Sequence, residues 1–384
     1  MSNTLTNILP KILARGLLAL REQAVMPRLV NGDYSSEAAQ KGDTIDVPIP
    51  SAIAASDVTP APTYSSATDS SPQKVQIQLN NWKKTNFSLT DKEMMEIDRN
   101  AHFMPMQMSE AVRALANVIN EDIHAEYKGV YGFTGTAGTT PFASTVADAV
   151  NSRKVLHQQR APRSMRRGVL DYDAEANALA LSAFSDAEKV GSSEVKIEGE
   201  VGRKFGVDWF ADDAVMTHTN GTLAALNTAV GSTTAIGGTT LKMTVVSVGT
   251  GVTAVGDVFT IAGDSQTYTV TDIVSAVASA TPKDVSISPA LQVIASATSG
   301  ITWKASHVVN LVFHRDAFAF ANRPLAASAA DLQLGSRIMS MTDPQTGITL
   351  RLEVSRQYKQ VTWEFDVLWG AKLVRPELAC RLAG

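Results

Sequence analysis

The sequence contains a single cysteine, Cys380, in 384 residues. One thiol cannot close an intramolecular disulfide, and it excludes the cysteine-rich metal sites of small zinc domains. No apolar run approaches the roughly 18 residues that a membrane-spanning helix requires. The net charge is only −4. That weakly acidic balance argues against a dedicated nucleic-acid-binding domain, which is normally strongly basic.

Charge is also scarce in the middle of the chain. Only seven of the 86 residues in segment 219–304 are charged, against 19% for the whole chain. Serine, threonine, glycine, alanine and valine dominate there, and short alternating runs such as 244–248 and 267–271 are typical of β-strands. This composition predicts a small all-β domain inserted into a body of mixed α and β structure.

Seven aliphatic residues near the N-terminus fall at helical spacing: Leu5, Ile8, Leu9, Ile12, Leu13, Leu17 and Leu20. Lys11 and Arg15 interrupt this stretch, whereas the apolar region of a secretory signal is uninterrupted. The pattern predicts an amphipathic helix that packs on protein, with docking on a membrane surface as the alternative. We therefore expect a protein that stays in a cytoplasm or is assembled there.

Two segments with strict alternation, 44–49 and 74–80, predict β-strands. Pro48 restricts the first strand to the edge of a sheet, because proline cannot donate to a central ladder. Residues 51–72 between the strands are rich in Ser, Ala, Thr and Pro, and are too long for an ordinary loop within a compact domain. They predict a hairpin that extends toward a neighbouring molecule; a disordered surface loop is the alternative.

A long helix is predicted at about 104–128, with Pro105 in its first turn and Gly129 as its C-terminal stop. A helix of this length measures about 30 Å and its apolar face is narrow, which suits a spine lying across a sheet. Thr90 and Glu93 form a capping box that opens a short helix before it.

The rest of the chain alternates between helical and extended patterns. We expect helices at 144–159, at 174–184 and from Asp316 onward, and strands at 168–170, within 198–210, and at 308–313, 348–354 and 361–367.

A search for catalytic chemistry finds no complete set of residues. The six histidines (102, 124, 157, 218, 307 and 314) lack metal-ligand spacing, and His124 is predicted on a solvated face of the long helix beside Glu121. Asp212 and Asp213 are adjacent in sequence, so an acid/base geometry does not follow from them.

Two further motifs are incomplete. His314-Arg315-Asp316 resembles a kinase catalytic loop, but Ala321 occupies the position of the required asparagine. The glycines Gly132, Gly135 and Gly138 precede no P-loop lysine, and they predict a flexible loop. We predict no catalytic, cofactor-binding or metal-binding residues.

One cluster of positive charge stands out: Arg153, Lys154, Arg160, Arg163, Arg166 and Arg167. Six cations in 15 residues are compatible with contacts to nucleic-acid phosphates, with ion pairs to a neighbouring subunit, or with a solvated helix face. The stretch contains no aromatic residue, so base stacking is not indicated.

The order of these predicted elements resembles the Hong Kong 97-type fold of tailed-phage major capsid proteins. Five stretches are similar to the coat proteins of short-tailed Salmonella-type phages: 1–29, 45–50, 200–208, 311–325 and 373–379. That coat family carries a β-barrel insertion within its axial domain, where segment 219–304 interrupts this chain. The resemblance covers nearly the whole chain, although the insert matches in position and composition and not in sequence.

The resemblance implies an α+β fold with five parts. They are an N-terminal arm (1–40), an E-loop hairpin (41–87), a peripheral domain with the spine helix (88–130 plus 341–384), an axial domain (131–218 plus 305–340) and an inserted β-barrel or sandwich domain (219–304).

The implied function is a major capsid protein, not an enzyme, that self-assembles as hexamers and pentamers into an icosahedral shell around double-stranded DNA. The implied partners are scaffolding, portal and decoration proteins and the packaged DNA, bound without sequence specificity; no membrane and no cofactor are implied. The protein would be a virion component assembled in the host cytoplasm.

Maturation by conformational change is implied, with Gly129, Gly132 and Gly135 as candidate bending points. Covalent crosslinking is not expected, because segment 51–72 contains no lysine. Three alternatives are a β-rich tail or adhesion protein that acts through the insert, a cellular shell protein of the same fold and an α/β enzyme.

Overall fold

The computed structural model describes residues 13–14, 16–17, 24–32, 40–49, 57–58, 60, 73–92, 106–185, 201–279, 281–325, 337–343 and 346–384. Most of the predicted N-terminal helix, nearly all of segment 51–72, and both Glu93 and Pro105 lie outside these residues. Thr90 ends a strand, so the capping box stays a prediction. Leu13 and Leu17 of the N-terminal stripe are described, and both belong to the main hydrophobic core.

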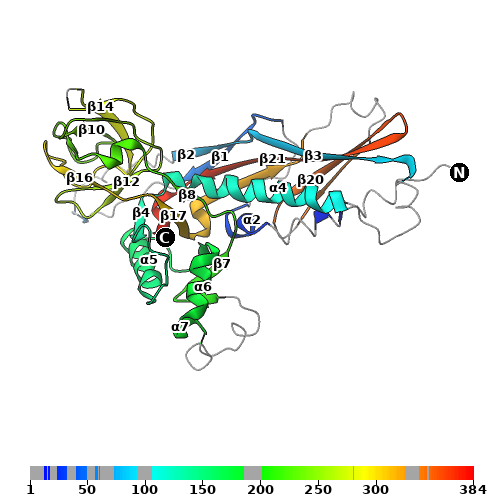
Figure 1. Ribbon diagram of the computed structural model, residues 1–384, viewed down its shortest axis with the longest axis horizontal. Coiled ribbons are helices and arrows are strands. Elements are labelled where there is room, and N and C mark those ends of the chain that lie inside the picture. The colour runs from blue at the N-terminus through cyan, green and yellow to red at the C-terminus, as the bar shows by residue number, and fades with distance from the viewer. Residues whose placement is uncertain are drawn as a thin grey trace.

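One antiparallel sheet forms the long arm of the molecule (Figure 1). Its strands follow the order β18-β21-β20-β19. Strand β3 pairs with the edge of β21 that is opposite to β20. The predicted strands at 348–354 and 361–367 are confirmed as parts of β20 and β21. The bounds are Asn81–Thr90 (β3), Phe318–Arg323 (β18), Arg337–Thr342 (β19), Thr349–Gln357 (β20) and Gln360–Leu373 (β21).

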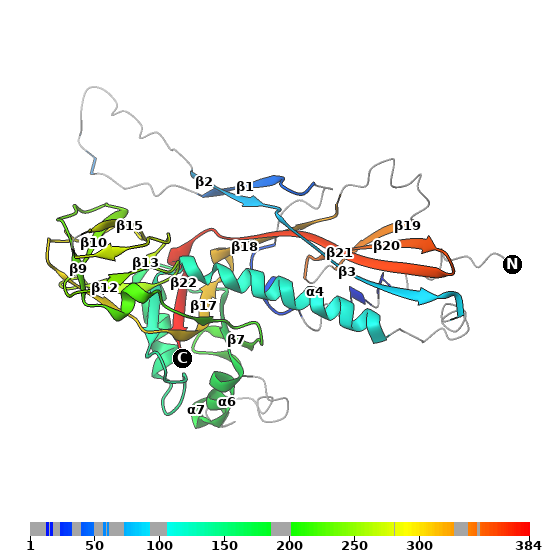
Figure 2. The same ribbon diagram turned by 45° about the horizontal axis from the view of Figure 1, so that its top comes forward.

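The predicted spine helix is confirmed as α4, Met106–Ala125, which continues into a 3-10 turn, η2, Glu126–Gly129. It lies along the arm sheet in both ribbon views (Figures 1 and 2). Val112, Leu115 and Ile119 are buried in the main core, as the narrow apolar stripe requires.

The second sheet is mixed and lies at the other end of α4. Its order is β4-β22-β17-β5-β7-β6, with β8 paired to β17, so the C-terminal strand lies between segments from the middle of the chain. The bounds are Gly132–Gly135 (β4), Arg166–Leu170 (β5), Gly202–Lys204 (β6), Val207–Ala211 (β7), Thr217–His218 (β8), His307–His314 (β17) and Ala379–Ala383 (β22). Three helices lie beside this sheet: α5 (Ala147–Gln158), α6 (Tyr172–Ala180) and α7 (Ser182–Ser185).

The prediction of a helix from Asp316 onward is wrong. The helix expected from Asp316 is a single 3-10 turn, η4, Arg315–Ala317, followed by strand β18. Phe318 and Phe320 enter the main core while Ala319 and Ala321 enter a second apolar cluster, so the strand is buried on both faces and shows no polar alternation.

The glycine-rich segment predicted as a flexible loop begins with a strand, because Gly132–Gly135 pairs in parallel with the C-terminal strand. A Cβ on Gly132 would lie 2.7 Å from the carbonyl oxygen of Ala379, and one on Gly135 would lie 2.6 Å from that of Ala383. These glycines therefore permit close backbone contact. Their exchange for alanine would test packing, not bending.

Segment 228–303 contains a closed six-stranded barrel in the order β10-β15-β13-β12-β16-β9. Its interior is an apolar cluster of its own, separate from the main core, with Phe259 and Tyr268 among its largest residues. Closure leaves this barrel no free edge. The bounds are Thr228–Val230 (β9), Thr240–Val245 (β10), Val258–Ile261 (β12), Lys283–Ser288 (β15), Thr267–Val270 (β13) and Gly300–Trp303 (β16). A two-stranded sheet of β11 (Thr250–Gly251) and β14 (Val277–Ala278) accompanies it.

The two strands predicted around segment 51–72 form an antiparallel hairpin, β1 (Thr44–Ile49) with β2 (Gln73–Gln78). Figure 2 shows it beside β18 and β21, on the side of the sheet away from α4. Ile45 and Ile77 lie opposite each other and pack, with Leu79, on Ala319 and Ala321 of β18. Within the described part of the chain β1 has one strand partner, which fits the edge position predicted from Pro48.

The helical segment ends at Gly129 as predicted, but Gly129 is the last residue of the 3-10 turn and the C-cap is Val130. A Cβ on Gly129 would lie 2.6 Å from Cδ2 of Leu373. The missing side chain therefore lets β21 pass close to the end of the spine helix.

Replacing Gly129 with alanine is expected to lower the free energy of unfolding by about 1–3 kcal/mol, because the added methyl group overpacks against Leu373. The double variant Gly129→Ala/Leu373→Ala should be more stable than the sum of the two single losses implies. Urea denaturation of the three variants and the parent measures this coupling. Strictly additive losses would contradict the packing explanation.

Candidate functional site

The barrel joins the rest of the molecule at a buried junction centred on Arg381 of β22. This side chain is 0% exposed, and its Nη1 donates to the carbonyl oxygen of Gly256 at 2.7 Å. Nη2 donates to the carbonyl oxygen of Lys128 at 3.1 Å and to Oγ1 of Thr269 at 3.3 Å. The guanidinium also lies 5.1 Å from the centre of the Tyr127 ring, within cation–π range. Burial lowers the pKa of Arg381 to about 10, so it stays charged at neutral pH.

An Asp–His–Tyr chain of hydrogen bonds runs beside this arginine. His218 Nε2 lies 3.0 Å from Oδ1 of Asp257, and His218 Nδ1 lies 3.2 Å from the hydroxyl of Tyr127. Asp257 also accepts from the backbone N–H of Ala254 at 2.8 Å. The three side chains come from the barrel, β8 and η2, so the chain of bonds ties the barrel to the end of the spine helix.

Two more histidines border this junction. The His307 ring lies 5.6 Å from that of His218, and its Nδ1 donates to the carbonyl oxygen of Ala305 at 2.8 Å. His124 Nε2 donates to the carbonyl oxygen of Val309 at 3.1 Å. Burial, followed by the nearby charge of Arg381, lowers the pKa of both His124 and His307 to about 4. Both rings are therefore neutral at pH 7.

The prediction that His124 lies on a solvated face is wrong, because its side chain is 0% exposed. The opposite side of α4 packs on the arm sheet, while His124 faces strand β17 of the second sheet. Asn120, His124 and Tyr127 form a polar stripe at helical spacing and all are buried. This stripe is the sequence signal that His124 is buried, since an exposed helix face would carry more charge.

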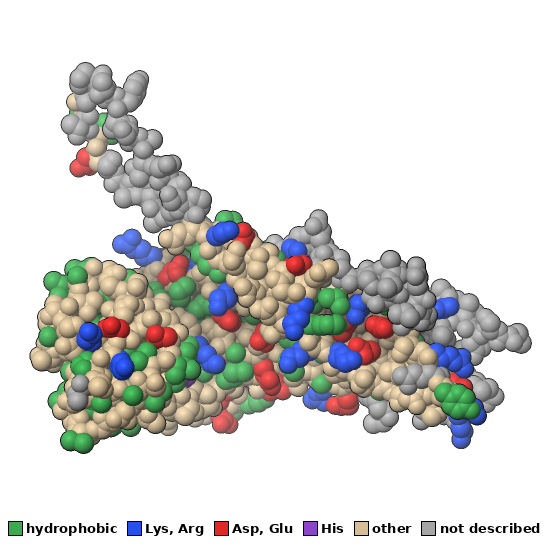
Figure 3. All heavy atoms as spheres, turned by 90° about the horizontal axis from the view of Figure 1, so that it is seen from above, with side chains coloured by type: hydrophobic (Ala, Val, Ile, Leu, Met, Phe, Trp, Pro, Cys, Tyr) green, Lys and Arg blue, Asp and Glu red, His purple; other side chains and the backbone are tan. Residues whose placement is uncertain are grey.

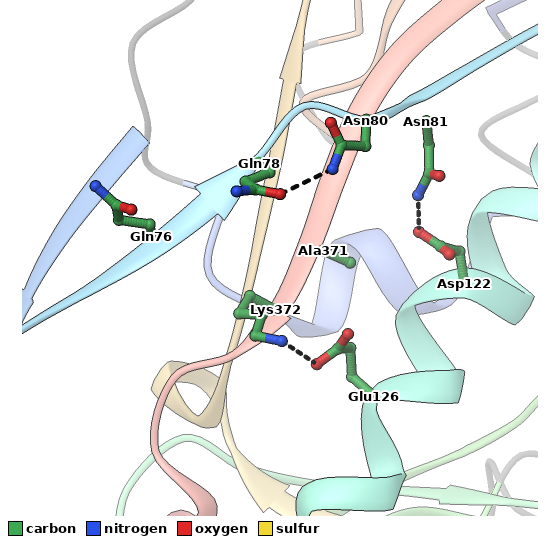
Figure 4. A pocket seen from close by; sticks show the side chains of 8 residues that line it. All are labelled: Gln76, Gln78, Asn80, Asn81, Asp122, Glu126, Ala371 and Lys372. Carbon is green, nitrogen blue, oxygen red and sulfur yellow. Dashed lines mark hydrogen bonds and ion pairs between the residues drawn. The ribbon is translucent and has the colours of Figure 1, made fainter. Parts of the chain in front are cut away.

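Three cavities border the C-terminal end of α4 or the 3-10 turn η2 that continues it. One, of about 460 Å³, is lined by β2, α4 and β21; Figure 4 shows Asn81 bonded to Asp122 at 2.6 Å and Lys372 paired with Glu126 at 3.9 Å. A neighbouring cavity of about 380 Å³ shares Asp122, Glu126 and Lys372 with it. The third, of about 690 Å³, lies at the barrel junction and is lined by residues that include Tyr127 and His218.

These cavities contain no assembled catalytic set. Burial raises the pKa of Tyr127, the opposite of what activates a nucleophile, although it bonds His218. Burial, and after it contact with Asp213, raises the pKa of Asp212 to about 7, and its Oδ2 has no hydrogen-bond partner. Asp212 lines none of these three cavities.

The structure divides the predicted cation cluster into two groups. Arg166 is 2% exposed and donates to the carbonyl oxygens of Ala161 and Pro162, and Arg167 donates to that of Arg28. These two arginines stabilise the fold. The other four members are exposed at α5 and the turn that follows it: Arg153, Lys154, Arg160 and Arg163.

The remaining sequence motifs have structural roles. His314 caps the 3-10 turn, because its Nδ1 accepts from the backbone N–H of Asp316 at 3.2 Å. Among the residues the structure describes, no group of three or more His, Cys, Asp or Glu side chains is placed to hold a metal ion. No helix within these described residues is long and apolar enough to cross a membrane.

A sheet crossed by a spine helix, a projecting hairpin and a second mixed sheet constitute a Hong Kong 97-type capsid fold, as the sequence resemblance implied. No known protein family matches the sequence, and no curated protein matches it. Among solved structures, a chain from Mycobacterium phage Che8 matches with a TM-score of 0.50 and 13% identity, over 94% of this chain and 90% of that one. At this identity the likeness establishes a shared fold.

Two further structures are similar at lower scores. The capsid of the cyanophage P-SCSP1u has a TM-score of 0.47 at 12% identity, over 93% of this chain and 87% of that one. A virus-like particle from Pyrococcus furiosus has a TM-score of 0.45 at 8% identity, over 97% and 98% of the two chains.

Replacing Arg381 with methionine is expected to lower the free energy of unfolding by roughly 2–5 kcal/mol, because buried carbonyl groups lose a charged donor. Arg113→Met, on the exposed face of α4, is the matched control and should stay within about 0.5 kcal/mol of the parent. Urea denaturation measures both. Equal stability of the two variants would show that Arg381 does not hold the junction together.

Acid is expected to destabilise the fold through His124 and His307. Each has a folded-state pKa of about 4, below the usual 6.5, so the unfolded chain takes up protons first as the pH falls from 6.5 to 4. Each histidine thus removes about 1.4 kcal/mol of stability per pH unit in that interval. Asp212, whose folded-state pKa is raised to about 7, acts in the opposite direction there and partly masks the loss.

Comparison with His124→Gln separates the histidine from the carboxyl group. Between pH 6 and 4.5, the unfolding free energy of the parent should fall more steeply than that of the variant, by about 1.4 kcal/mol per pH unit. Parallel pH profiles from urea denaturation would rule out a buried neutral His124.

Proposed function

We propose that this chain is the major capsid protein of a tailed double-stranded DNA bacteriophage, assembling as hexamers and pentamers into an icosahedral shell. The observation that carries the proposal is the fold match to the phage Che8 chain, which extends over 94% of this chain. A likeness confined to one domain would leave the rest of the chain free for another function. The proposal includes that this chain has no enzymatic activity.

The exposed edge of the hairpin supports assembly. Strand β1 pairs with β2 on one side, and the other side of this two-stranded sheet has no partner strand among the described residues. Isolated two-stranded sheets are at best marginally stable in water. This hairpin is held at its base by Ile77 and Leu79, which are both 0% exposed. In the shell, its outer part gains contacts from a neighbouring subunit, as extended segments of obligate interfaces do.

We propose the five-part division implied by the sequence: arm 1–40, E-loop 41–87, peripheral domain 88–130 plus 341–384, axial domain 131–218 plus 305–340, and insert 219–304. Contacts at the base of the barrel support the last boundary. Asn220 Nδ2 donates to the carbonyl oxygen of Lys304, and Asn220 N donates to Oγ of Ser306 at 3.0 Å. The segments that enter and leave the barrel are thus hydrogen-bonded to each other where the proposed insert begins and ends.

The proposed partners are other copies of the chain, scaffolding and portal proteins, a decoration protein and the packaged DNA. The shell assembles in the host cytoplasm and becomes part of the virion. It matures by conformational change, without covalent crosslinking between subunits. Membership in the coat family of short-tailed Salmonella-type phages is part of the same proposal.

Replacing Ile77 with aspartate is expected to abolish shell formation, because a charge under the hairpin base detaches the hairpin from β18. The chain, expressed with its neighbouring genes, should form closed icosahedral shells by electron microscopy, whereas Ile77→Asp should yield soluble capsomers or monomers. Gln73→Asp, at the exposed far end of the same strand, is the control and should assemble. Monodisperse monomers or dimers of the parent under every condition would refute the capsid function.

A further inference from the structure

Four exposed cations lie on α5 and in the segment directly after it, and we call them the α5 cation face: Arg153, Lys154, Arg160 and Arg163. Arg153 and Lys154 lie on α5, and the other two lie in the turn that follows it. Arg153 donates to the carbonyl oxygen of Phe205 at 3.2 Å and to His157 at 3.3 Å. In the part of the chain that the structure describes, none of the four makes an ion pair with a carboxylate.

Two cations of this face, Arg153 and Arg163, lie close enough to act on the neighbouring Arg166 and His157. Partial desolvation, and then the charges of Arg166, Arg163 and Arg153, lower the pKa of His157. Desolvation, followed by the charges of Arg153 and Arg163, also lowers the pKa of Arg166. Repulsion of this kind costs folding free energy, so the face has positive charge that the described residues do not neutralise.

Nearby carboxylates have other partners. Asp208 pairs with Arg203 at 3.5 Å, and Asp148 accepts from the backbone N–H of Phe142 at 2.9 Å. The whole chain has a net charge of −4, so a local excess of cations is not a consequence of a basic composition. Positive charge gathered on one face of an acidic protein indicates an anionic partner.

The chemistry of the face fits the backbone of a duplex. Arginine forks match phosphate oxygens. Double-stranded DNA carries about one charge per 1.7 Å of its axis, so neighbouring cations can contact neighbouring phosphates. Segment 153–167 has no aromatic side chain, and single-strand binding depends on such stacking platforms.

We infer that the α5 cation face binds the phosphate backbone of double-stranded DNA and faces the interior of the shell. This inference rests on the proposed capsid function, because it takes the packaged genome as the partner. Binding is independent of sequence, because the face offers charges and no group suited to read base edges. The four cations reduce the repulsion between an acidic shell protein and its polyanionic contents.

The test compares two triple variants with the same net charge. Lys154→Gln/Arg160→Gln/Arg163→Gln removes three cations of the face, and Lys83→Gln/Lys92→Gln/Lys359→Gln removes three exposed cations of the arm sheet and its adjoining turn. Each set includes one residue with a left-handed backbone, Arg160 (φ 60°) and Lys359 (φ 57°), so backbone effects are matched.

Fluorescence anisotropy with a 30-base-pair DNA duplex measures the affinity of the purified full chain over a range of salt concentrations. Each phosphate contact contributes about 0.9 to the slope of log K against log salt. The face variant should lose up to about three contacts, and its slope should be shallower by up to about 2.7, whereas the control should match the parent. A charge-preserving variant, Arg160→Lys/Arg163→Lys, should retain the parental slope.

Equal slopes for the face variant and the control would overturn the inference. Normal DNA binding with failed shell assembly in the face variant would also overturn it, and would assign the face to a contact between subunits. Loss of slope in the face variant when the parent forms no shells would support the DNA surface and remove the capsid proposal. Normal shells with equal slopes would leave the capsid function standing without the DNA surface.

Discussion

The buried guanidinium of Arg381 is the constraint on which the arrangement of the domains depends. A charged group that is 0% exposed is tolerated only where polar atoms surround it, and here the acceptors come from the 3-10 turn of the spine helix and from the barrel. Moving the barrel away from the body would take the Gly256 carbonyl and the Thr269 hydroxyl from the cation and leave it with the Lys128 carbonyl. The barrel is therefore held in one orientation by the last strand of the chain.

This fixed orientation bears on assembly. A shell protein must present the same surfaces in every copy. The hairpin and the spine helix contact β21, and the barrel contacts β22, so residues 360–383 connect all three. On the face shown in Figure 3, charged side chains are sparse over the barrel and denser over the sheet and helix beside it. The charge-poor segment thus builds a neutral module beside a charged body, and the cations of α5 lie on a different element of that body.

Several elements were predictable from local pattern. The alternation in 44–49, 348–354 and 361–367 identified strands with one buried face, and the stripe along α4 identified the spine helix. Where burial is two-sided, the pattern fails. Strand β18 was mistaken for a helix because both of its faces are apolar, and His124 was mistaken for a surface residue because a second layer covers its side of α4.

The sequence by itself determined the secondary structure of one-sided elements, the all-β character of the middle segment and the order of parts that resembles a capsid fold. Only the tertiary structure decided which polar residues meet. Arg381 contacts Gly256 and Lys128, which are 125 and 253 residues away in the chain, and the six clustered cations separate into one buried (Arg166), one half-buried (Arg167) and four exposed. Periodicity reports the environment of one element, whereas burial and ion pairing depend on surfaces brought together from distant segments.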